Sequence, residues 1–347
     1  MTQGRSTSSP VTIHTVAEHA GVSRQTVSNA LNAPHKLLPE TLERVTKSIA
    51  ALGYRPNDAA RSLKTQATRL IACRLLPSTT DGTVAVLDRF LHALCTSARD
   101  RGYDVLIFSA ATDDDELSVM SDLLGRRAVD AYVLTETHAG DRRRSWLRER
   151  GAPFVSFGRP WGDEDGPDSW VDVDGALGVT RVVEHLIELG HRRIGFLGWP
   201  AGSGSGDDRL SGWTGALNRA RLPRRGLLAR TANGIDEARS AANSLLQQDD
   251  RPTALVCVSD TVAFGAMRAA ADAGLRVGED LSVVGFDDSP VAPLTQPALS
   301  SVRQPLEQVA ERVVQLLLVE PPDRPVRELI EPTLVIRGST AAARGPN

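Results

Sequence analysis

The feature that most restricts the fold is an alternation that begins near residue 70 and continues to about residue 286. Short apolar runs are separated by longer segments whose apolar residues have helical spacing. The strand-like runs lie at 70–76, 103–108, 128–134, 153–157, 193–198, 253–258 and 281–286. The helix-like segments include 84–101, 176–189, 236–248 and 260–273. This alternation is typical of parallel sheets covered by helices on both faces.

The length of the chain leaves room for two units of this kind. It has 347 residues, and since a domain takes about 100–200 residues, two or three domains are expected. Two doubly wound parallel sheets of about five strands each would account for the alternating region. A stretch rich in Gly, Asp and Pro at 158–169 lies near the expected seam. Because open sheets bind ligands at the carboxyl ends of their strands, a cleft between the sheets is the expected binding site.

The first part of the chain has a different pattern, with three short helical segments and no strand-like run. The expected helices are Ile13–Ala20, 24–31 and Pro39–Leu52. Thr12 can cap the first helix, and Gly21 can follow it in a left-handed conformation. Ser23, after a single turn, can cap the second. Two short helices joined by a tight glycine turn form the helix-turn-helix arrangement, whose second helix enters the major groove of DNA.

The exposed face of the expected second helix carries suitable groups for reading bases. Gln25 and Asn29 are four residues apart and share one face, and each amide can bond the N6 and N7 edge of adenine. Arg24 can reach guanine or a phosphate. The alternative is a solvated helix in an ordinary small bundle, although the geometry favours DNA binding.

Charge is distributed unevenly along the chain. Residues 1–66 hold eight Lys and Arg against four acidic residues, and all three lysines precede residue 65. Since the whole chain has a formal net charge of -3, the remainder carries -7. A small basic head on an acidic body is typical of a nucleic-acid-binding domain joined to another domain. An arginine-rich composition could produce the same asymmetry by chance.

Several classes of protein are excluded by the sequence. The three cysteines, Cys73, Cys95 and Cys257, are far apart and predict neither a disulfide framework nor a zinc site. No apolar run approaches the ~18 residues of a membrane span, so no membrane partner is expected. Residues 1–10 are polar and predict a disordered tail, and no hydrophobic segment of a secretory signal follows. A cytoplasmic protein is therefore expected.

No enzyme motif is present. The glycine-rich run 202–206 lacks the lysine of a phosphate-binding P-loop, and its central residue, Gly204, is not the serine of a nucleophile elbow. His185 and His191 are six residues apart, which places them on different faces of a helix. We therefore expect no catalytic residues, no metal site and no cofactor.

Motifs along nearly the whole chain resemble those of the LacI/GalR family of transcription regulators. They occur in the family's order: TIHTVAEHAGVSRQTVSNALN from Thr12, ETLERVTKSIAALGYRPNDAARSLKT from Glu40, VEHLIELGHRRIGFLG at 183–198, DRLSGWTGAL at 208–217, VSDTVAFGAMRAAADAGLRVGEDLSVVGFDDSP at 258–290 and EPTLVIRGST at 331–340. The resemblance implies an all-α helix-turn-helix headpiece, a hinge, and an α/β core of two sub-domains similar to those of periplasmic binding proteins, with parallel, doubly wound sheets.

The same resemblance implies the domain boundaries. The DNA-binding domain is expected at 11–56, the hinge at 57–66 and the core at 67–347. Within the core, one sub-domain takes about 67–171 and 302–327, and the other about 172–301 and 328–347. Beyond residue 340 nothing resembles a leucine heptad, so a tetramerising tail is not expected.

The resemblance also implies which residues contact DNA. The hinge is expected to become helical only when it pairs with its dimer mate on DNA, where Leu63 would insert into the minor groove. A helix this short is not stable alone, which agrees with that expectation. An ordinary linker contact is the alternative for Leu63. The expected DNA-contacting residues are Thr12, Ser23, Arg24, Gln25, Thr26, Ser28, Asn29, Asn32, Lys36, Tyr54, Asn57, Ala60 and Leu63.

Five residues are expected to contact a small-molecule effector. Arg209, which precedes Gly212 and Trp213, and Asp287 stand at the family's ligand positions, whereas Ser259 replaces a frequent asparagine. Arg159 and Trp161 are candidates because they stand where many members carry an aspartate contact, although a structural loop is the alternative there. Trp161 could stack on a sugar ring. Trp213 is expected in the core, and the roles of Trp170 and Trp199 are left open.

The resemblance departs from the family pattern in places. Thr15 stands where an acidic residue usually completes the first helix cap, and Leu38-Pro39 replaces a serine cap before the third helix. Each change is expected to weaken the headpiece by about 0.5–2 kcal/mol. Asn29 is often arginine in the family, so the operator sequence cannot be copied from other members.

The function expected is that of a homodimeric, ligand-responsive transcription regulator. It would be a repressor that binds a near-palindromic double-stranded operator and responds to a small molecule, with a sugar as the best candidate. Within the family, a corepressor-dependent regulator of the purine-repressor type is an alternative. Outside it, a stand-alone sugar-binding protein shares the core fold, but residues 11–65 argue against that reading.

Overall fold

The structure is a computed structural model that describes residues 11–54, 67–77, 83–319 and 324–344. It divides into two compact units, Met1–Thr68 and Arg69–Asn347. The tail predicted at 1–10 and the hinge predicted at 57–66, which includes Asn57, Ala60 and Leu63, lie outside the described residues.

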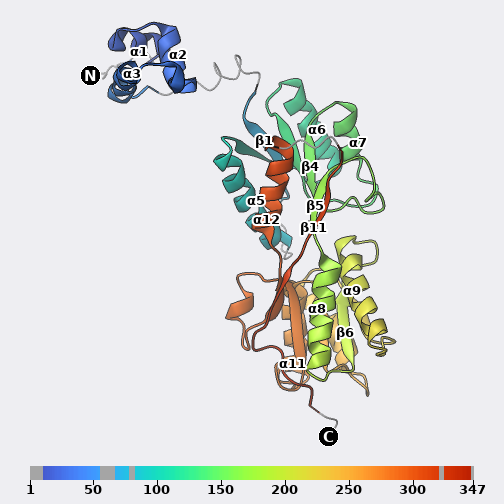
Figure 1. Cartoon of the computed structure of the whole chain (residues 1–347). Coiled ribbons are helices and arrows are strands. Elements are labelled where there is room, and N and C mark those ends of the chain that lie inside the picture. Colours follow the sequence, from blue (N-terminus) through green and yellow to red (C-terminus); the bar gives the residue numbers. More distant parts are fainter. Residues whose placement is uncertain (1–10, 55–66, 78–82, 320–323, 345–347) are drawn as a thin grey trace, which may run out of the picture. The chain divides into compact units, whose positions relative to one another are not determined.

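The first unit is a small helical bundle (Figure 1). Its elements are α1 (Ile13–Ala20), α2 (Arg24–Asn32), the 3-10 turn η1 (Pro34–Lys36) and α3 (Pro39–Leu52). The three predicted helices are therefore confirmed. Apolar positions at helical spacing place Val16, Val27 and Val45 together in a fully buried core.

The caps of these helices correct one expectation. Thr15 does complete the cap of α1: the Thr12 hydroxyl accepts from Thr15 N–H at 3.4 Å, and the Thr15 hydroxyl accepts from Thr12 N–H at 3.3 Å. A threonine hydroxyl can replace the usual carboxylate because the capping box needs only an acceptor at that position. By contrast, α3 has no side-chain cap at Leu38 and begins with Pro39.

The second unit contains two sheets of six strands, rather than the five expected. The first sheet has the order β11-β5-β4-β3-β1-β2 and the second β12-β10-β9-β8-β6-β7. All pairs are parallel except β10 with β12. The strands are β1 (Leu70–Leu75), β2 (Asp104–Ser109), β3 (Ala131–Leu134), β4 (Phe154–Phe157), β5 (Trp170–Val173), β6 (Ile194–Gly198), β7 (Leu228–Arg230), β8 (Ala254–Cys257), β9 (Ser282–Asp287), β10 (Ser300–Arg303), β11 (Arg327–Ile330) and β12 (Thr333–Val335).

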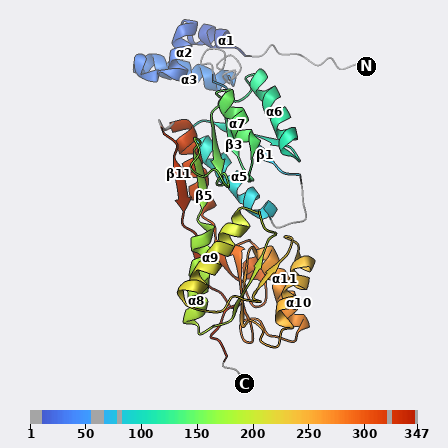
Figure 2. The ribbon, with the colours of Figure 1, turned by 90° about the vertical axis from the view of Figure 1, so that its right-hand side faces the viewer.

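Helices cover both faces of each sheet, as the alternation predicted (Figures 1 and 2). The first sheet with α5 (Thr83–Asp100), α6 (Asp113–Gly125), α7 (Arg142–Glu149), α12 (Leu306–Val314) and the π-helical turn η3 (Gln315–Val319) is called the N lobe. The second sheet with α8 (Gly175–Glu188), α9 (Ser205–Arg219), α10 (Ile235–Leu246), α11 (Asp260–Asp272) and η2 (Ala292–Leu294) is called the C lobe. No helix in the described ranges is both long and apolar enough to cross a membrane.

Strand β1 shows how the two faces of a sheet are divided. Ile71 and Cys73 point into the cluster that α5 and α12 cover, whereas Ala72 belongs to the cluster under α6 and α7. Successive side chains of a strand point to opposite faces, so Arg74 falls on the α6 and α7 side.

The chain crosses between the lobes three times, each time within two or three residues of the approximate boundary predicted. The expected boundaries at 171/172, 301/302 and 327/328 fall inside β5, β10 and β11, which the structure keeps whole. The crossings therefore follow Val173, Arg303 and Ile330. Each of these strands is hydrogen-bonded to its neighbour along its full length, so the chain can pass to the other lobe only after the strand ends.

Candidate nucleic-acid interface and ligand cleft

Helix α2 presents its amide side chains on an exposed face. Gln25 is exposed and donates from Nε2 to Asn29 Oδ1 at 2.9 Å, which aligns the two amides. Val27 points the other way, into the core. The Gln25 amide oxygen and the Asn29 amide nitrogen stay available, and this donor and acceptor pair matches the edge of adenine.

Other residues predicted to contact DNA have structural partners in the bundle. Ser23 caps α2 by accepting from Thr26 N–H at 3.1 Å. Asn32 donates from Nδ2 to the Ser28 carbonyl at 2.9 Å. Tyr54 packs against the core of the bundle, while Arg24 and Lys36 are exposed. The exposed set is therefore centred on the first turns of α2, which is the part of a recognition helix that contacts bases.

A cleft lies between the two lobes at the carboxyl ends of their strands. Its volume is about 680 Å³.

 That volume falls within the roughly 300–1,000 Å³ of typical ligand pockets. Both lobes supply its walls, with Arg74, Thr135, Glu136, Thr137, His138 and Trp161 from the N lobe and Trp199, Ser203, Arg209, Asn233 and Asp287 from the C lobe.

Arg209 is buried in the C-lobe wall. Its Nη1 donates to the Val258 carbonyl at 2.6 Å and lies 3.8 Å from Asp287 Oδ1, while the guanidinium lies 3.7 Å from the centre of the Phe286 ring. Burial lowers the pKa of Arg209, against the attraction of Asp287. Its Nε has no hydrogen-bond partner in the part of the chain that the structure describes. The arginine is thus held in place with a donor left over for a ligand.

Gly212, three residues after Arg209, lies where α9 packs closely against α8. A Cβ at position 212 would lie 2.2 Å from the Ala176 carbonyl oxygen of α8. Helices α8 and α9 can therefore pack closely only with glycine there, and this packing sets the position of the turn that carries Arg209.

Asp287 ends strand β9 beside Arg209. Its φ of 112° is unusual for a residue other than glycine, and such strained backbone is often found at binding sites. The carboxylate accepts from Gln304 Nε2 at 2.7 Å. Burial raises the pKa of Asp287 to about 7, although Arg209 opposes the shift. The two oppositely charged groups can together bond to a ligand hydroxyl, which both donates and accepts.

The raised pKa of Asp287 predicts a pH-dependent stability. In the unfolded chain an aspartate titrates near about 3.9, so the folded state binds the proton more tightly. The stabilisation is complete below about pH 4 and is lost as the pH rises through about 7. Between these values, wild type should lose up to about 1.4 kcal/mol of unfolding free energy per pH unit relative to Asp287→Asn. Urea denaturation across this range measures the difference, and a difference independent of pH would contradict the prediction.

The structure places Ser259 and Arg159 behind the cleft wall. Ser259 caps α11 by accepting from Val262 N–H at 3.2 Å and donates to Asn233 Oδ1 at 2.7 Å, so Asn233 lines the cleft instead. Arg159 forms ion pairs with Asp172 at 2.9 Å and Asp208 at 2.7 Å. Both predicted residues therefore already have protein partners.

The predicted tryptophans separate into two groups. Trp161 lines the cleft, with the Arg159 guanidinium 4.5 Å from its ring centre, and Trp199 lines it from the C lobe. Trp213 is buried and donates from Nε1 to the Ile194 carbonyl at 3.1 Å, which confirms its place in the core. Trp170 is also buried.

Sequence reasoning missed several polar groups of the cleft. Arg74 Nε, Thr135 Oγ1, Trp199 Nε1 and Ser203 Oγ are buried cleft atoms without a hydrogen-bond partner among the described residues. Buried polar atoms usually have partners, so a polar ligand would satisfy groups of this kind. Arg74 could have been noticed, because an arginine inside an apolar strand is rare unless it is paired.

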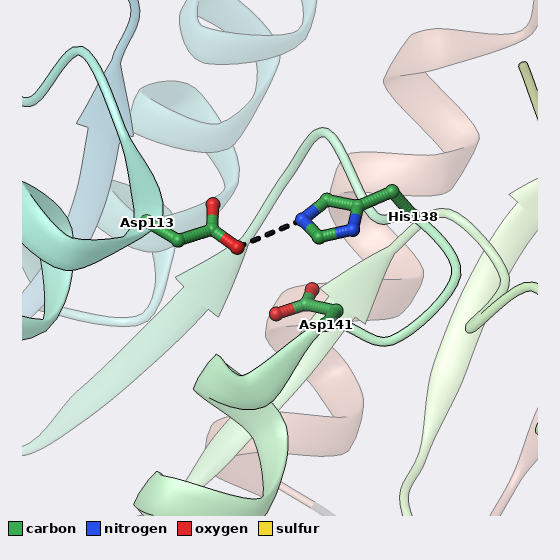
Figure 3. Close-up of side chains that lie close together, drawn as sticks. All are labelled: Asp113, His138 and Asp141. Carbon is green, nitrogen blue, oxygen red and sulfur yellow. Dashed lines mark hydrogen bonds and ion pairs between the residues drawn. The ribbon is translucent and has the colours of Figure 1, made fainter.

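Asp113, His138 and Asp141 lie close together in the N lobe (Figure 3), and His138 also lines the cleft. His138 Nε2 lies 2.8 Å from Asp113 Oδ2, and its Nδ1 lies 3.0 Å from the Ala139 carbonyl oxygen. Asp113, His138 and Asp141 have ligand atoms close enough for a metal ion. However, Asp141 accepts from Arg143 N–H, Nε and Nη2. The guanidinium thus already neutralises this carboxylate.

The histidine in this cluster is favoured in its charged form. Against the effect of burial, the hydrogen bonds to Ala139 and Asp113 raise the pKa of His138. Arg143 overcomes burial and lowers the pKa of Asp141. Since both ring nitrogens of His138 face oxygen acceptors, an imidazolium that donates twice fits the site better than a neutral ring that binds a metal.

In comparisons with known proteins, each of the two units matches a family model. Residues 12–57 match the model described as bacterial regulatory proteins, lacI family, and residues 183–340 match a periplasmic binding protein-like domain. The chain is 32% identical to the HTH-type transcriptional regulator CelR of Thermobifida fusca, over 94% of this chain and 98% of that protein. It is 30% identical to the HTH-type transcriptional repressor PurR of Mannheimia succiniciproducens, with the same coverage of 94% and 98%.

Solved structures show the same similarity. The lac repressor dimer bound to operator and the anti-inducer ONPF has a TM-score of 0.80 and 27% identity, over 96% of this chain and 100% of that chain. The complex of the transcriptional regulator CelR with cellobiose has a TM-score of 0.71 and 29% identity, over 95% of this chain and 99% of that chain. The relatives are named as transcription regulators or repressors.

Proposed function

Because the chain belongs to the LacI family of bacterial regulatory proteins, we propose how its parts divide the work of a DNA-binding transcription regulator controlled by a small-molecule effector. Helix α2 reads the operator, and the cleft between the lobes binds the effector. The observation that carries this proposal is that one chain combines an exposed amide pair on α2 with a polar cleft in a separate unit.

The cleft favours an uncharged, hydroxyl-rich effector. Its charged lining includes the cations Arg74, Arg209 and, when protonated, His138, but also the carboxylates of Glu136, Asp172 and Asp287. A phosphate or carboxylate would meet these acidic groups, whereas hydroxyls can bond to both signs of charge. Trp161 and Trp199 supply indole surfaces on which a sugar ring can pack. The relative CelR has been solved with cellobiose, and we propose a saccharide effector for this chain.

A ligand screen tests the effector class. Cellobiose and glucose represent saccharides, and the purine bases hypoxanthine and guanine test the purine-repressor alternative. We expect a saccharide to raise the melting temperature of the full chain and to release it from DNA, since a ligand that binds only the folded state stabilises it. Stabilisation by a purine, together with tighter DNA binding, would support the alternative.

Operator reading by α2 is tested with DNA selected from a random duplex library by the wild-type chain. Gln25→Ala and Asn29→Ala should each weaken binding to that DNA by roughly 5- to 150-fold, the cost of about 1–3 kcal/mol for a lost bidentate base contact. Binding to unrelated DNA should barely change, because phosphate contacts supply it. Gel-shift titrations measure both.

A matched control is available on α3. Lys47 and Glu43 form an exposed ion pair at 2.8 Å, and the double variant Glu43→Gln/Lys47→Gln removes it without changing net charge. It should bind the selected DNA like wild type. If the α2 variants and this control lose affinity equally, the assignment of α2 fails.

We further propose that the regulator is a repressor and a homodimer that binds a near-palindromic operator. A two-fold dimer places two recognition helices on half-sites about one helical turn apart. The similarity to a lac repressor dimer supports this arrangement. Footprinting of the selected DNA should show two protected half-sites, and a single protected half-site would argue against the dimer.

A further inference from the structure

Two arginines of the N lobe contact the C lobe beside the two expected effector residues. Arg159 follows β4 and reaches Asp208 in the first turns of α9, with Nη2 2.7 Å from Oδ2. Arg89 on α5 donates from Nη1 to the carbonyl oxygen of Asp287 at 3.3 Å. Asp208 is the residue before Arg209. Each arginine therefore holds the segment that carries one effector-binding side chain.

The ion pair between Arg159 and Asp208 is largely buried, and both partners make further hydrogen bonds. The side chains of Arg159, Asp172 and Asp208 are 13%, 14% and 11% exposed, so solvent screens these pairs less than it screens surface pairs. Arg159 is braced inside its own lobe, because its N–H and Nε both donate to Asp172 Oδ2, at 3.2 and 2.9 Å. Asp208 Oδ2 also accepts from Ala176 N–H at 3.0 Å. The pair thus joins two groups that are each fixed to their own lobe.

Trp161 adds a packing contact at the same place. A Cβ at Gly204 would lie 2.6 Å from Trp161 Cδ1 and Nε1. Gly204 precedes α9 and has a φ of 60°, a conformation that also favours glycine. The N-lobe loop that carries Arg159 and Trp161 therefore packs against the start of α9, the helix that carries Arg209.

The Arg89 contact is anchored in a similar way. Its Nη2 lies 3.5 Å from Glu307 Oε1 of α12, in the same lobe, and its side chain is 25% exposed. The acceptor is the carbonyl of the residue whose φ of 112° turns the Asp287 side chain into the cleft. Movement of the lobes would therefore disturb the backbone that aims this carboxylate.

We propose that Arg159 and Arg89 are positioning residues that clasp the C lobe and complete the effector site across the cleft. That the ligand of the cleft is an effector rests on the proposed function. The clasp, meaning the contacts of Arg159 and Arg89 with the C lobe, does not depend on it. Two lobes joined by three crossings can close or rotate as rigid bodies. A ligand that binds Arg209 and Asp287 best in the clasped arrangement shifts the population toward that arrangement.

The experiment measures the distance between the lobes in the full chain by spin labelling. Arg126→Cys, directly after α6, and Arg219→Cys, at the end of α9, provide labels, since these side chains are 64% and 60% exposed. Cys95 is exposed and is replaced by serine, while Cys73 and Cys257 are buried. An excess of unlabelled chain ensures one labelled subunit per assembly.

Two variants each remove one contact between the lobes. Asp208→Asn cuts only the part of the Arg159 contact that crosses the cleft and leaves the pair with Asp172. Arg89→Gln removes the other contact. Each should broaden the distance distribution and lengthen its mean, and the double variant should do so most. Arg148→Gln breaks an ion pair of 2.8 Å within the N lobe and should leave the distribution unchanged.

Cellobiose provides a second readout. It should narrow the wild-type distribution, and the double variant should need a higher concentration, because apparent affinity falls with the fraction of competent molecules. If the double variant and wild type give the same distribution without ligand, the clasp is overturned. If cellobiose has no effect on wild type, its choice as effector fails, while the ligand-free distances still decide the clasp. Circular dichroism identifies any variant that fails to fold, and Arg89→Gln alone then remains the test.

Discussion

A fragment that begins at Arg69 should lose operator binding and keep effector binding. All of α1, α2 and α3 lie in the first compact unit, whereas the cleft lies entirely in the second. The affinity for specific DNA exceeds the affinity for non-specific DNA by about 10³-fold or more. Gel shifts on the selected DNA should therefore show a loss of affinity of at least that size. The acidic remainder, which carries -7, should not compensate, because phosphate contacts need cations.

The same fragment should retain its fold. Its two lobes have their own buried cores, which share no residue with the core of the helical bundle. The thermal shift produced by the effector found in the ligand screen should therefore match that of the full chain. Sequence-specific binding by the fragment would refute the assignment of DNA reading to residues 12–57, and an unfolded fragment would refute the independence of the core.

Replacing Arg209 should separate effector response from DNA binding. Arg209→Met keeps an apolar side chain over Phe286 but removes the donors that face Asp287 and the cleft. Loss of a hydrogen bond from a charged group costs about 1.5–3 kcal/mol, which corresponds to roughly 10- to 150-fold weaker effector binding. Isothermal titration measures the affinity, and gel shifts should show operator binding that no longer responds to effector.

An arginine elsewhere in the C lobe serves as the control. Arg268 on α11 is 60% exposed and pairs with Asp236 at 3.6 Å. Arg268→Met should bind effector and DNA like wild type. Unchanged effector affinity in Arg209→Met would contradict the role proposed for Arg209. A melting temperature far below that of the control would instead show that its bond to the Val258 carbonyl is chiefly structural.

The fold could be predicted because its signals are local. Apolar residues at helical spacing and the caps of Thr12 and Ser23 determine α1 and α2, and long apolar runs determine the central strands. Strands β5, β7, β10, β11 and β12 have only three or four residues each and lie at or next to the edges of the two sheets. They were not predicted as strands because such short segments become strands only when neighbours in the sheet supply hydrogen bonds.

For the candidate site, the sequence by itself indicated which residue types stand at the ends of strands and helices. This was enough to place Arg209, Asp287 and Trp161 at the cleft and Gln25 with Asn29 on one exposed face. Only the tertiary structure decided which side chains remain available to a ligand. Arg159 pairs with Asp208, and Ser259 bonds to Asn233. These partners are far apart along the chain, so no local sequence pattern indicates the contacts. Side-chain partners depend on which segments the fold brings together, and sequence spacing does not record that.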